Sequence, residues 1–229
     1  MIGSKKVISV IPARGGSKRL PGKNVLKLNG TPLIAYSIQS ALSCHLIDKV
    51  IVSTDSREIA DAAIDAGAEV DMRSEELSTD AATTIDVLKD LLVRLDSYEI
   101  CVTLQPTSPL RNADDITKSL ELFDKMSADA VISVCKAKHP PQRINTIGSK
   151  GEMDNFIREE VQSKRSQDLG DRYRLNGAIY CNLVRVLLNS NSPVFKSNHY
   201  AYVMPTNRSV DIDTKEDFDL AEYYITKNL

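Results

Sequence analysis

Four stretches of the chain are almost entirely apolar, rich in Val and Ile, and lack the alternation of apolar and polar positions typical of a half-exposed strand. They cover residues 7–12, 49–54, 99–105 and 129–135. Continuous runs of this kind are typical of strands buried on both faces of a sheet. We therefore predict four buried strands, with regular structure resuming at "NGAIYCNLV" and a further strand at 200–204.

Segments with a helical period lie between these runs. One should begin at Thr31-Pro32, read as a cap and first turn, and a second at Asn112, followed by acidic residues. Their predicted apolar faces consist of Leu33, Ile34, Ile38, Ala41 and Leu42 in the first helix, and of Ile116, Leu120, Phe123 and Met126 in the second. A final helix is expected at about 215–227. This alternation predicts an α/β fold with a doubly wound, mainly parallel sheet, whose ligands bind beyond the carboxyl ends of the strands.

The alternation stops after Cys135. Residues 136–173 are mostly polar, contain His139-Pro140-Pro141 and two glycines near 150, and have no long periodic segment. A stretch of this length is too long for an ordinary connection, so we interpret it as an inserted lobe in a single domain spanning 1–229.

The composition argues against several classes of protein. The 229 residues carry a net charge of −2 with 26% charged residues, which does not favour a nucleic-acid partner or an anionic membrane. Four scattered cysteines argue against a disulfide framework or a cysteine metal site. Neither an apolar stretch of about 18 residues nor a signal-peptide pattern is found, so we expect a soluble, cytoplasmic protein.

The first strand leads into a glycine-rich basic loop, "VISVIPARGGSKRLPGKN" at residues 7–24, which contains no acidic residue. Its cations are Arg14, Lys18, Arg19 and Lys23. The spacing fits neither a Walker loop nor a dinucleotide fingerprint. Backbone N–H groups at Gly15 and Gly16 can approach a phosphate, and so many cations suit a polyphosphate. The alternative is a solvated basic loop.

A second candidate is "SVDIDT", residues 209–214. In an extended chain Asp211 and Asp213 share one face, while Val210 and Ile212 point into the core. Two adjacent carboxylates suggest Mg²⁺, which prefers hard oxygen ligands and often shares them with phosphates. The alternative is that Asp213 only caps the last helix.

Two pairs of residues three positions apart are better explained as helix starts. Thr214 with Asp217 has the spacing of a capping box. Asp55 with Glu58 has the same spacing, so we assign Asp55 to capping rather than catalysis.

Two polar segments could recognise a small molecule. "VTLQPTSPLR", residues 102–111, is a strand followed by a turn dense in hydroxyl, amide and guanidinium groups. "RYRLNGAIY", residues 172–180, brings Arg174, Asn176 and Tyr180 near a glycine turn and would suit an anionic, hydroxylated ligand. The alternative for the first segment is a connection to the next helix that is shaped by its prolines. The alternative for the second is that its Arg and Tyr side chains only pack at the surface.

Taken together, "IPARGGSKRLPGKN", "LQPTSPLR", "RLNGAIY" and "DIDTKED" resemble the CMP-sialic acid synthetases, the N-acylneuraminate cytidylyltransferase family. The likeness covers nearly the whole chain in order. It implies a nucleotidyltransferase domain with a small dimerisation lobe at 136–173, hence a homodimer. It also implies transfer of CMP from CTP to a nine-carbon 2-keto sugar acid, with release of pyrophosphate.

The resemblance also implies residue roles. The triphosphate would be held by Arg14, Ser17, Lys18 and Lys23, and the cytidine by Asn24, Arg73 and Thr84. The sugar acid would face Gln105, Thr107, Ser108, Arg174, Asn176 and Tyr180. Mg²⁺ would be held by Asp211 and Asp213. Lys23 and Arg14 would be catalytic by stabilising negative charge on the phosphates. Asp211 is a candidate acceptor for the sugar hydroxyl proton; the alternative is that a metal-bound hydroxyl loses its proton without a base.

The chain departs from the family pattern at three places. Ser74 follows Arg73 where a proline is common, Thr84 replaces a serine, and the arginine before "NGAIY" is displaced by one residue at Arg165. The third departure leaves open whether Arg165 contacts sugar or phosphate, or whether the arginine is missing from its place.

The acceptor sugar also stays open. N-acetylneuraminate and legionaminate fit the loop best, with pseudaminate and ketodeoxyoctonate as alternatives. From another class, the alternative is a non-catalytic module that senses CTP or a CMP-sugar.

Overall fold

A computed structural model describes residues 1–189 and 198–227. Within them the main sheet has seven strands. In spatial order they are β5 (Glu69–Met72), β4 (Lys49–Thr54), β1 (Val7–Pro12), β6 (Ile100–Thr103), β8 (Tyr173–Leu183), β7 (Ala130–Lys136) and β9 (His199–Met204). Only β8 runs antiparallel to its neighbours β6 and β7 among these strands. The predicted mainly parallel sheet and its four buried runs are confirmed.

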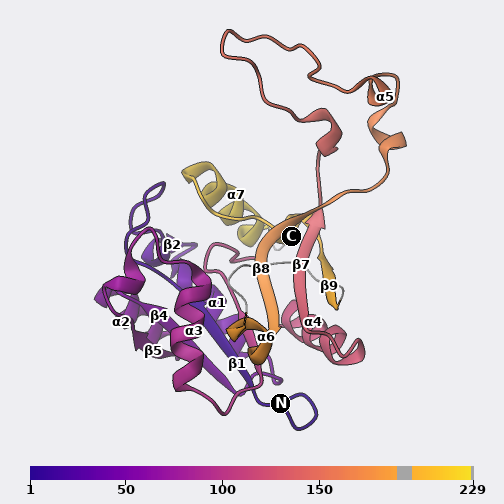
Figure 1. Cartoon of the computed structure of the whole chain (residues 1–229). Helices are drawn as coiled ribbons and strands as arrows, with labels where there is room; N and C mark the ends of the chain where they lie inside the picture. Colours follow the sequence, from indigo (N-terminus) through magenta and orange to yellow (C-terminus); the bar gives the residue numbers. More distant parts are fainter. Residues whose placement is uncertain (190–197, 228–229) are drawn as a thin grey trace.

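Helices cover both faces of this sheet (Figure 1). They are α1 (Leu33–Leu42), α2 (Arg57–Asp65), α3 (Thr84–Arg94), α4 (Ala113–Lys125) and α6 (Val184–Leu188). Alternate residues of β1 show the two layers, because Ile11 packs with α1, α2 and α4, whereas Ile8 and Val10 pack with α3 and α6. The doubly wound prediction is therefore confirmed.

A third apolar cluster joins the candidate metal segment to the last helix. Val210 and Ile212 are buried against Phe218 of α7 (Lys215–Thr226), together with residues near the short hairpin of β2 (Lys27–Leu28) and β3 (Thr31–Pro32). Val210 and Ile212 thus face the core, as predicted. Asp217 completes the predicted capping box with Thr214.

Some local predictions were wrong. Thr31 and Pro32 belong to β3, and α1 begins at Leu33 without a side-chain cap, because Pro32 already carries the chain into the helix from an extended pair. Leu42 and Met126 lie at the ends of their helices and are 51% and 38% exposed, so neither continues the buried face. The start of α4 at Asn112 is confirmed by a capping box.

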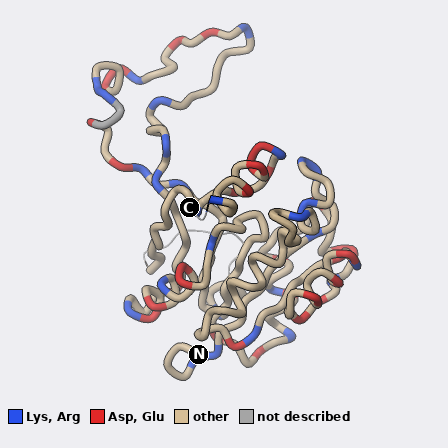
Figure 2. Tube along the Cα trace, turned by 180° about the vertical axis from the view of Figure 1, so that it is seen from behind, with Lys and Arg blue, Asp and Glu red and all other residues tan. Residues whose placement is uncertain are grey.

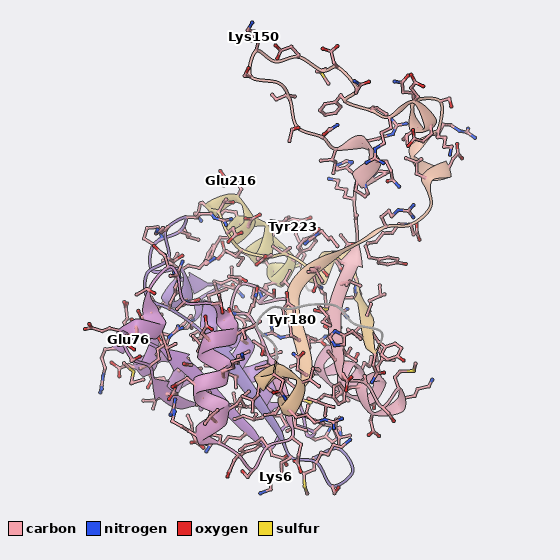
Figure 3. All side chains as sticks on the ribbon, in the orientation of Figure 1. Lys6, Glu76, Lys150, Tyr180, Glu216 and Tyr223 are labelled. Atoms are coloured by element: carbon pink, nitrogen blue, oxygen red, sulfur yellow. The ribbon has the colours of Figure 1, made fainter. Side chains whose placement is uncertain are left out.

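Residues 137–172 form an arm that leaves the sheet between β7 and β8 (Figure 1). Its short helices are η3 (Pro141–Arg143), α5 (Glu159–Gln162) and η4 (Ser166–Leu169). At its base Lys136 forms an ion pair with Asp171, and Ala137 N–H donates to the carbonyl of Arg172 at 2.8 Å. Lys150 marks the far end of the arm, away from Tyr180 in the body (Figure 3). The arm is thus a long insertion in the hairpin formed by β7 and β8.

Candidate active site

The basic loop follows the carboxyl end of β1, where a doubly wound sheet binds its ligands. Its Lys and Arg residues are visible near α7 (Figure 2). Gly15 N–H donates to Asp55 Oδ1 at 2.8 Å, and a Cβ added at Gly15 would lie 3.0 Å from Ser56 Cβ. The chain therefore passes so close to the end of β4 that a side chain at this position would be crowded.

This contact corrects the role given to Asp55. The cap of α2 is Ser56, whose hydroxyl accepts from Ile59 N–H, while the Asp55 carboxylate holds the backbone of the basic loop at Gly15. The spacing of Asp55 and Glu58 suited a capping box, but the cap is the next residue along the chain.

A cavity of about 620 Å³ opens beside this loop. All seven residues predicted to bind the nucleotide line it: Arg14, Ser17, Lys18, Lys23, Asn24, Arg73 and Thr84. Gln105, Thr107 and Asp213 also line it. The structure thus brings together the ends of β1, β5 and β6, the start of α3 and the segment before α7 around one cavity.

The cations of the loop contact two carboxylates. Asp80 accepts from Arg14 Nη1 at 2.9 Å and lies 2.6 Å from Lys18 Nζ. Asp213 lies 2.5 Å from Arg19 Nη1 and 3.4 Å from Lys23 Nζ. Hydrogen bonds from the two basic groups keep the pKa of Asp80 below its ordinary value. The donors of these cations thus point at anionic oxygens inside the cavity, and phosphate oxygens would suit the same donors.

Lys23 differs from the other cations because only 8% of it is exposed. Its Nζ donates to the carbonyl of Ile212 at 2.5 Å, between the two candidate metal ligands. An ammonium fixed in this way needs little rearrangement to stabilise negative charge developing nearby.

The candidate metal ligands sit in different surroundings. Burial and the neighbouring Asp213 raise the pKa of Asp211, and a hydrogen bond from the Thr107 hydroxyl opposes that shift. Thr107 also accepts Ile212 N–H on its carbonyl at 2.8 Å. Thr107, assigned to the sugar from resemblance, therefore also fixes the aspartate segment.

Gly177 on β8 leaves room for two polar side chains to approach the strand. Its φ is +74°, and a Cβ there would lie 2.7 Å from Gln105 Oε1 and 3.7 Å from Asp211 Oδ2. Tyr180 lies further along the same strand (Figure 3), and burial and Asp211 raise the pKa of its phenol. A hydroxylated ligand at this place would meet an amide, a carboxylate and a phenol.

Two predicted sugar-binding residues are buried beneath this place. Asn176 is 1% exposed, and its amide donates to Ser209 Oγ at 3.0 Å and accepts from Ser133 Oγ at 2.6 Å. Ser108 is fully buried and donates to the carbonyl of Asn176 at 3.4 Å. Neither lines the cavity in this structure, so their contacts support the walls of the site.

Arg174 and Arg165 occupy different regions. Arg174 Nη2 donates to the carbonyl of Ser209 at 3.0 Å, and its charge acts on Asp211, so it lies at the predicted sugar side. Arg165 lies in the arm, where its Nε pairs with Asp168 at 3.2 Å.

Arg73 leaves unused hydrogen-bond donors at the cavity. Its Nε and Nη2 are buried without a partner, and burial lowers its pKa. Buried donors of this kind are costly unless a ligand or water satisfies them. They fit a nucleotide-binding role for Arg73.

Residues outside the predicted set stabilise the aspartate segment. Asp115 is fully buried and accepts from Arg208 Nη2 at 2.7 Å and Nε at 3.2 Å. Arg208 directly precedes the segment that carries Asp211. The acidic start of α4 was visible in the sequence, but its partner, 93 residues away, was not.

Arg111 connects the two polar segments. It is 1% exposed, and its Nη1 donates to the carbonyls of Gln105 at 3.3 Å and Ala178 at 3.1 Å. Burial lowers its pKa to about 10. Because Arg111 binds carbonyls of both segments, it fixes residues 102–111 against the glycine turn of β8.

Comparison with known proteins identifies the family of the chain. Residues 8–223 match the family described as Cytidylyltransferase. The chain belongs to the cytidylyltransferase family. An N-acylneuraminate cytidylyltransferase of Streptococcus agalactiae is 38% identical over 215 residues, covering 93% of this chain and 52% of that protein. The chain thus spans about half the length of this streptococcal relative.

Another cytidylyltransferase relative matches end to end. The CMP-N,N'-diacetyllegionaminic acid synthase of Legionella pneumophila is 36% identical over 234 residues, covering 97% of both chains. Among solved structures, a CMP:2-keto-3-deoxy-manno-octonic acid synthetase complexed with CTP has a TM-score of 0.75 at 20% identity, over 98% of this chain and 100% of that one. This structural likeness shows the shared fold.

The described residues also bear on the expectations about metal, membrane and cysteines. In residues 1–189 and 198–227, no group of three or more His, Cys, Asp or Glu side chains is placed to hold a metal ion. No helix in the part of the chain that the structure describes has the length and apolar character needed to cross a membrane. All four cysteines are buried and free.

Proposed function

We propose that this cytidylyltransferase transfers CMP from CTP to the anomeric hydroxyl of a nine-carbon, sialic-acid-like 2-keto sugar acid and releases pyrophosphate. The observation that carries the proposal is one cavity lined by the four cations of the basic loop, by Asp80 and Asp213 and by Gln105. Asp211 and Tyr180 lie next to it rather than in its lining, on the side of Gln105 and Gly177. A cationic loop suits a triphosphate, and the neighbouring hydroxyl- and amide-rich surface suits a sugar acid.

The residues have distinct tasks in this reaction. Arg14, Lys18 and Arg19 bind the β- and γ-phosphates and stabilise the charge on the departing pyrophosphate. Lys23, buried beside the aspartate segment, stabilises charge on the α-phosphate as the sugar oxygen approaches in line. A bond forms between the anomeric oxygen and the α-phosphorus while the bond to the pyrophosphate oxygen breaks.

The proton of the sugar hydroxyl needs an acceptor. A carboxylate has two oxygens, so Asp211 could accept this proton on one of them while the other holds a metal ion. Asp211 lies near Gln105 and Gly177, at the side assigned to the sugar. We therefore assign the acceptor role to Asp211.

The donor set fits Mg²⁺. Two carboxylates, Asp211 and Asp213, offer hard oxygen ligands, and magnesium commonly completes its shell with phosphates and water rather than with further side chains. When bound, the ion would withdraw charge from the phosphate and the attacking hydroxyl. Before it binds, Asp213 is paired with Arg19 and Lys23, so these cations would exchange the carboxylate for phosphate oxygens.

The acceptor can be identified by pyrophosphate release. CTP and Mg²⁺ are offered with N-acetylneuraminate, legionaminate, pseudaminate or ketodeoxyoctonate in separate reactions, with a chelator as the metal control. The proposal predicts release with N-acetylneuraminate or legionaminate, and loss of release with the chelator. Tight CTP binding without release from any of the four would contradict the enzyme proposal and favour a sensing module.

A homodimer formed through the arm is part of the proposal. Ile144, Ile147 and Met153 are 65%, 65% and 60% exposed there, and an adjoining cavity of about 330 Å³ is lined partly by Ile144 and Phe156. Apolar side chains clustered on a projecting segment favour burial against another surface. The proposed partner is a second copy of the chain.

Light scattering tests this part. The wild type is expected at twice the mass of one chain, and Ile147→Asp should shift it toward the monomer. Val93→Asp is the matched control, because Val93 is 67% exposed on α3 in the body. A monomeric wild type at micromolar concentration, or equal effects of both variants, would contradict the dimer.

The proposed setting is the cytoplasm. Four buried free thiols suit a reducing compartment, and CTP is an intracellular substrate.

A further inference from the structure

One acidic residue of the cavity has no assigned role. Asp80 lies between η2 (Glu76–Ser78) and α3, on the wall opposite the phosphate loop. Its two carboxylate oxygens contact different cations, with Oδ1 2.9 Å from Arg14 Nη1 and Oδ2 2.6 Å from Lys18 Nζ. A single carboxylate thus bridges two cations expected to hold phosphates.

The arrangement has a direct consequence for anion binding. Arg14 and Lys18 direct their donors at Asp80, so an incoming phosphate oxygen must replace a carboxylate oxygen or lie beside its negative charge. Asp80 is 59% exposed at the side chain, and exposed ion pairs of this kind are weak. A ligand with several charged oxygens can therefore displace Asp80, whereas a ligand that makes one weak contact gains little.

We propose that Asp80 is a specificity-determining residue that acts as an internal competitor for the phosphate site. In the nucleotide-free protein its carboxylate occupies the donors of Arg14 and Lys18, and a polyphosphate displaces it. An anion must therefore compete with the Asp80 carboxylate for the two cations before it fills the site. The inference rests on the proposed function, because that function assigns the two cations to the triphosphate.

Further features favour this role over simple surface pairing. The two partners of Asp80 belong to the loop after β1, whereas Asp80 belongs to the segment that continues into α3. The contacts therefore join the two walls of the cavity across its opening, 66 residues apart in sequence for Arg14. Displacement of Asp80 by a polyphosphate would free one wall from the other as the ligand enters.

The test compares anion binding by Asp80→Asn and by the wild type. Asparagine keeps the size of the side chain but removes its charge. Dissociation constants are measured by calorimetry for inorganic pyrophosphate and orthophosphate without metal, and for cytidine as an uncharged ligand. Pyrophosphate is expected to bind about three- to tenfold more tightly to the variant, with a smaller gain at high salt and no change for cytidine.

Asp61→Asn is the matched control. Asp61 is also 59% exposed and pairs with an arginine, Arg57, but on the outer face of α2. It should leave pyrophosphate binding unchanged. Asp80→Ser removes the carboxylate differently and should reproduce the gain, and thermal unfolding verifies that each variant is folded.

Several results would overturn the inference. Unchanged or weaker pyrophosphate binding by Asp80→Asn would show that the carboxylate does not compete. An equal gain in Asp61→Asn would show a general effect of charge. The binding result is independent of turnover. Tighter pyrophosphate binding by Asp80→Asn, in a protein that uses no sugar acid, would refute the proposed function but not the role of Asp80. Normal turnover without tighter pyrophosphate binding by Asp80→Asn would refute the role of Asp80 but not the proposed function.

Discussion

The buried pair of Asp115 and Arg208 should stabilise both the fold and the aspartate segment. Asp115 is fully buried, Arg208 is 29% exposed, and two hydrogen bonds of 2.7 Å and 3.2 Å join them. Asp115 also accepts from the Tyr202 hydroxyl at 3.1 Å and from the backbone of Asn112 at 3.2 Å. Asp115→Ala removes all of these contacts at once.

The size of the effect follows from these contacts. Loss of one partner of a buried ion pair costs about 3–5 kcal/mol, and partial access of Arg208 to water places the expected loss near the lower end, at about 3 kcal/mol. For a chain of this length that corresponds to a fall in Tm of about 6–12 °C. Because Arg208 directly precedes the aspartate segment, the concentration of Mg²⁺ needed for half-maximal turnover should also rise.

Thermal and urea unfolding measure the stability, and pyrophosphate release at varied Mg²⁺ measures the second effect. Asp114→Ala is the control, since Asp114 is 59% exposed and pairs with Lys118 on the surface of the same helix. Asp115→Asn retains the shape of the side chain and separates charge from packing. If Asp115→Ala were no less stable than Asp114→Ala, the reasoning about this buried pair would be wrong.

Three further predictions concern the site itself. Asp211→Asn should abolish turnover but leave CTP binding nearly intact, and unchanged turnover would refute the role of Asp211. Burial raises the pKa of Asp211 above the ordinary 3.8, so the folded protein loses stability as pH rises from 3.8 through the pKa of the folded state. Asp211→Asn should therefore melt at a higher temperature than the wild type at pH 7. Lys23→Ala should lower kcat by about 10²–10³, a loss that normal kinetics would contradict. Gly177→Ala, with φ +74° and a Cβ 2.7 Å from Gln105 Oε1, should raise KM for the sugar acid but not for CTP; equal rises in both would place the defect elsewhere.

Local patterns predicted the fold because they depend on neighbouring residues. The continuous apolar runs predicted β1, β4, β6 and β7, and Asn112 with the acidic residues after it predicted the start of α4. β5 was not predicted, because its sequence "EVDM" is short and half polar. The antiparallel direction of β8 depends on the arm that precedes it, and no residue within the strand encodes that direction.

The candidate site was predictable where its residues lie within motifs. The basic loop and the two aspartates were found by charge and alternation alone, and resemblance supplied Arg73 and Thr84. Asp80 and Arg208 were missed because their roles depend on partners 66 and 93 residues away. Neither has a local signal that distinguishes it from an ordinary surface charge.

Burial also changed the interpretation of single residues. Asn176 belongs to a motif that suggested sugar binding, yet its amide is engaged by Ser133 and Ser209 below the cavity. Thr107 likewise contacts the aspartate segment through both its hydroxyl and its carbonyl. A motif identifies the residues near a site, but the neighbours of each side chain determine which of them line it.

The most direct test of the account is the identity of the product formed under competition. The protein is incubated with Mg²⁺, equal concentrations of CTP, UTP, ATP and GTP, and N-acetylneuraminate or legionaminate, and the products are identified by mass spectrometry. The account predicts a CMP-sugar together with pyrophosphate, and its absence when Asp211→Asn replaces the wild type. A product carrying another nucleotide, or a CMP-sugar formed equally well by Asp211→Asn, would contradict it.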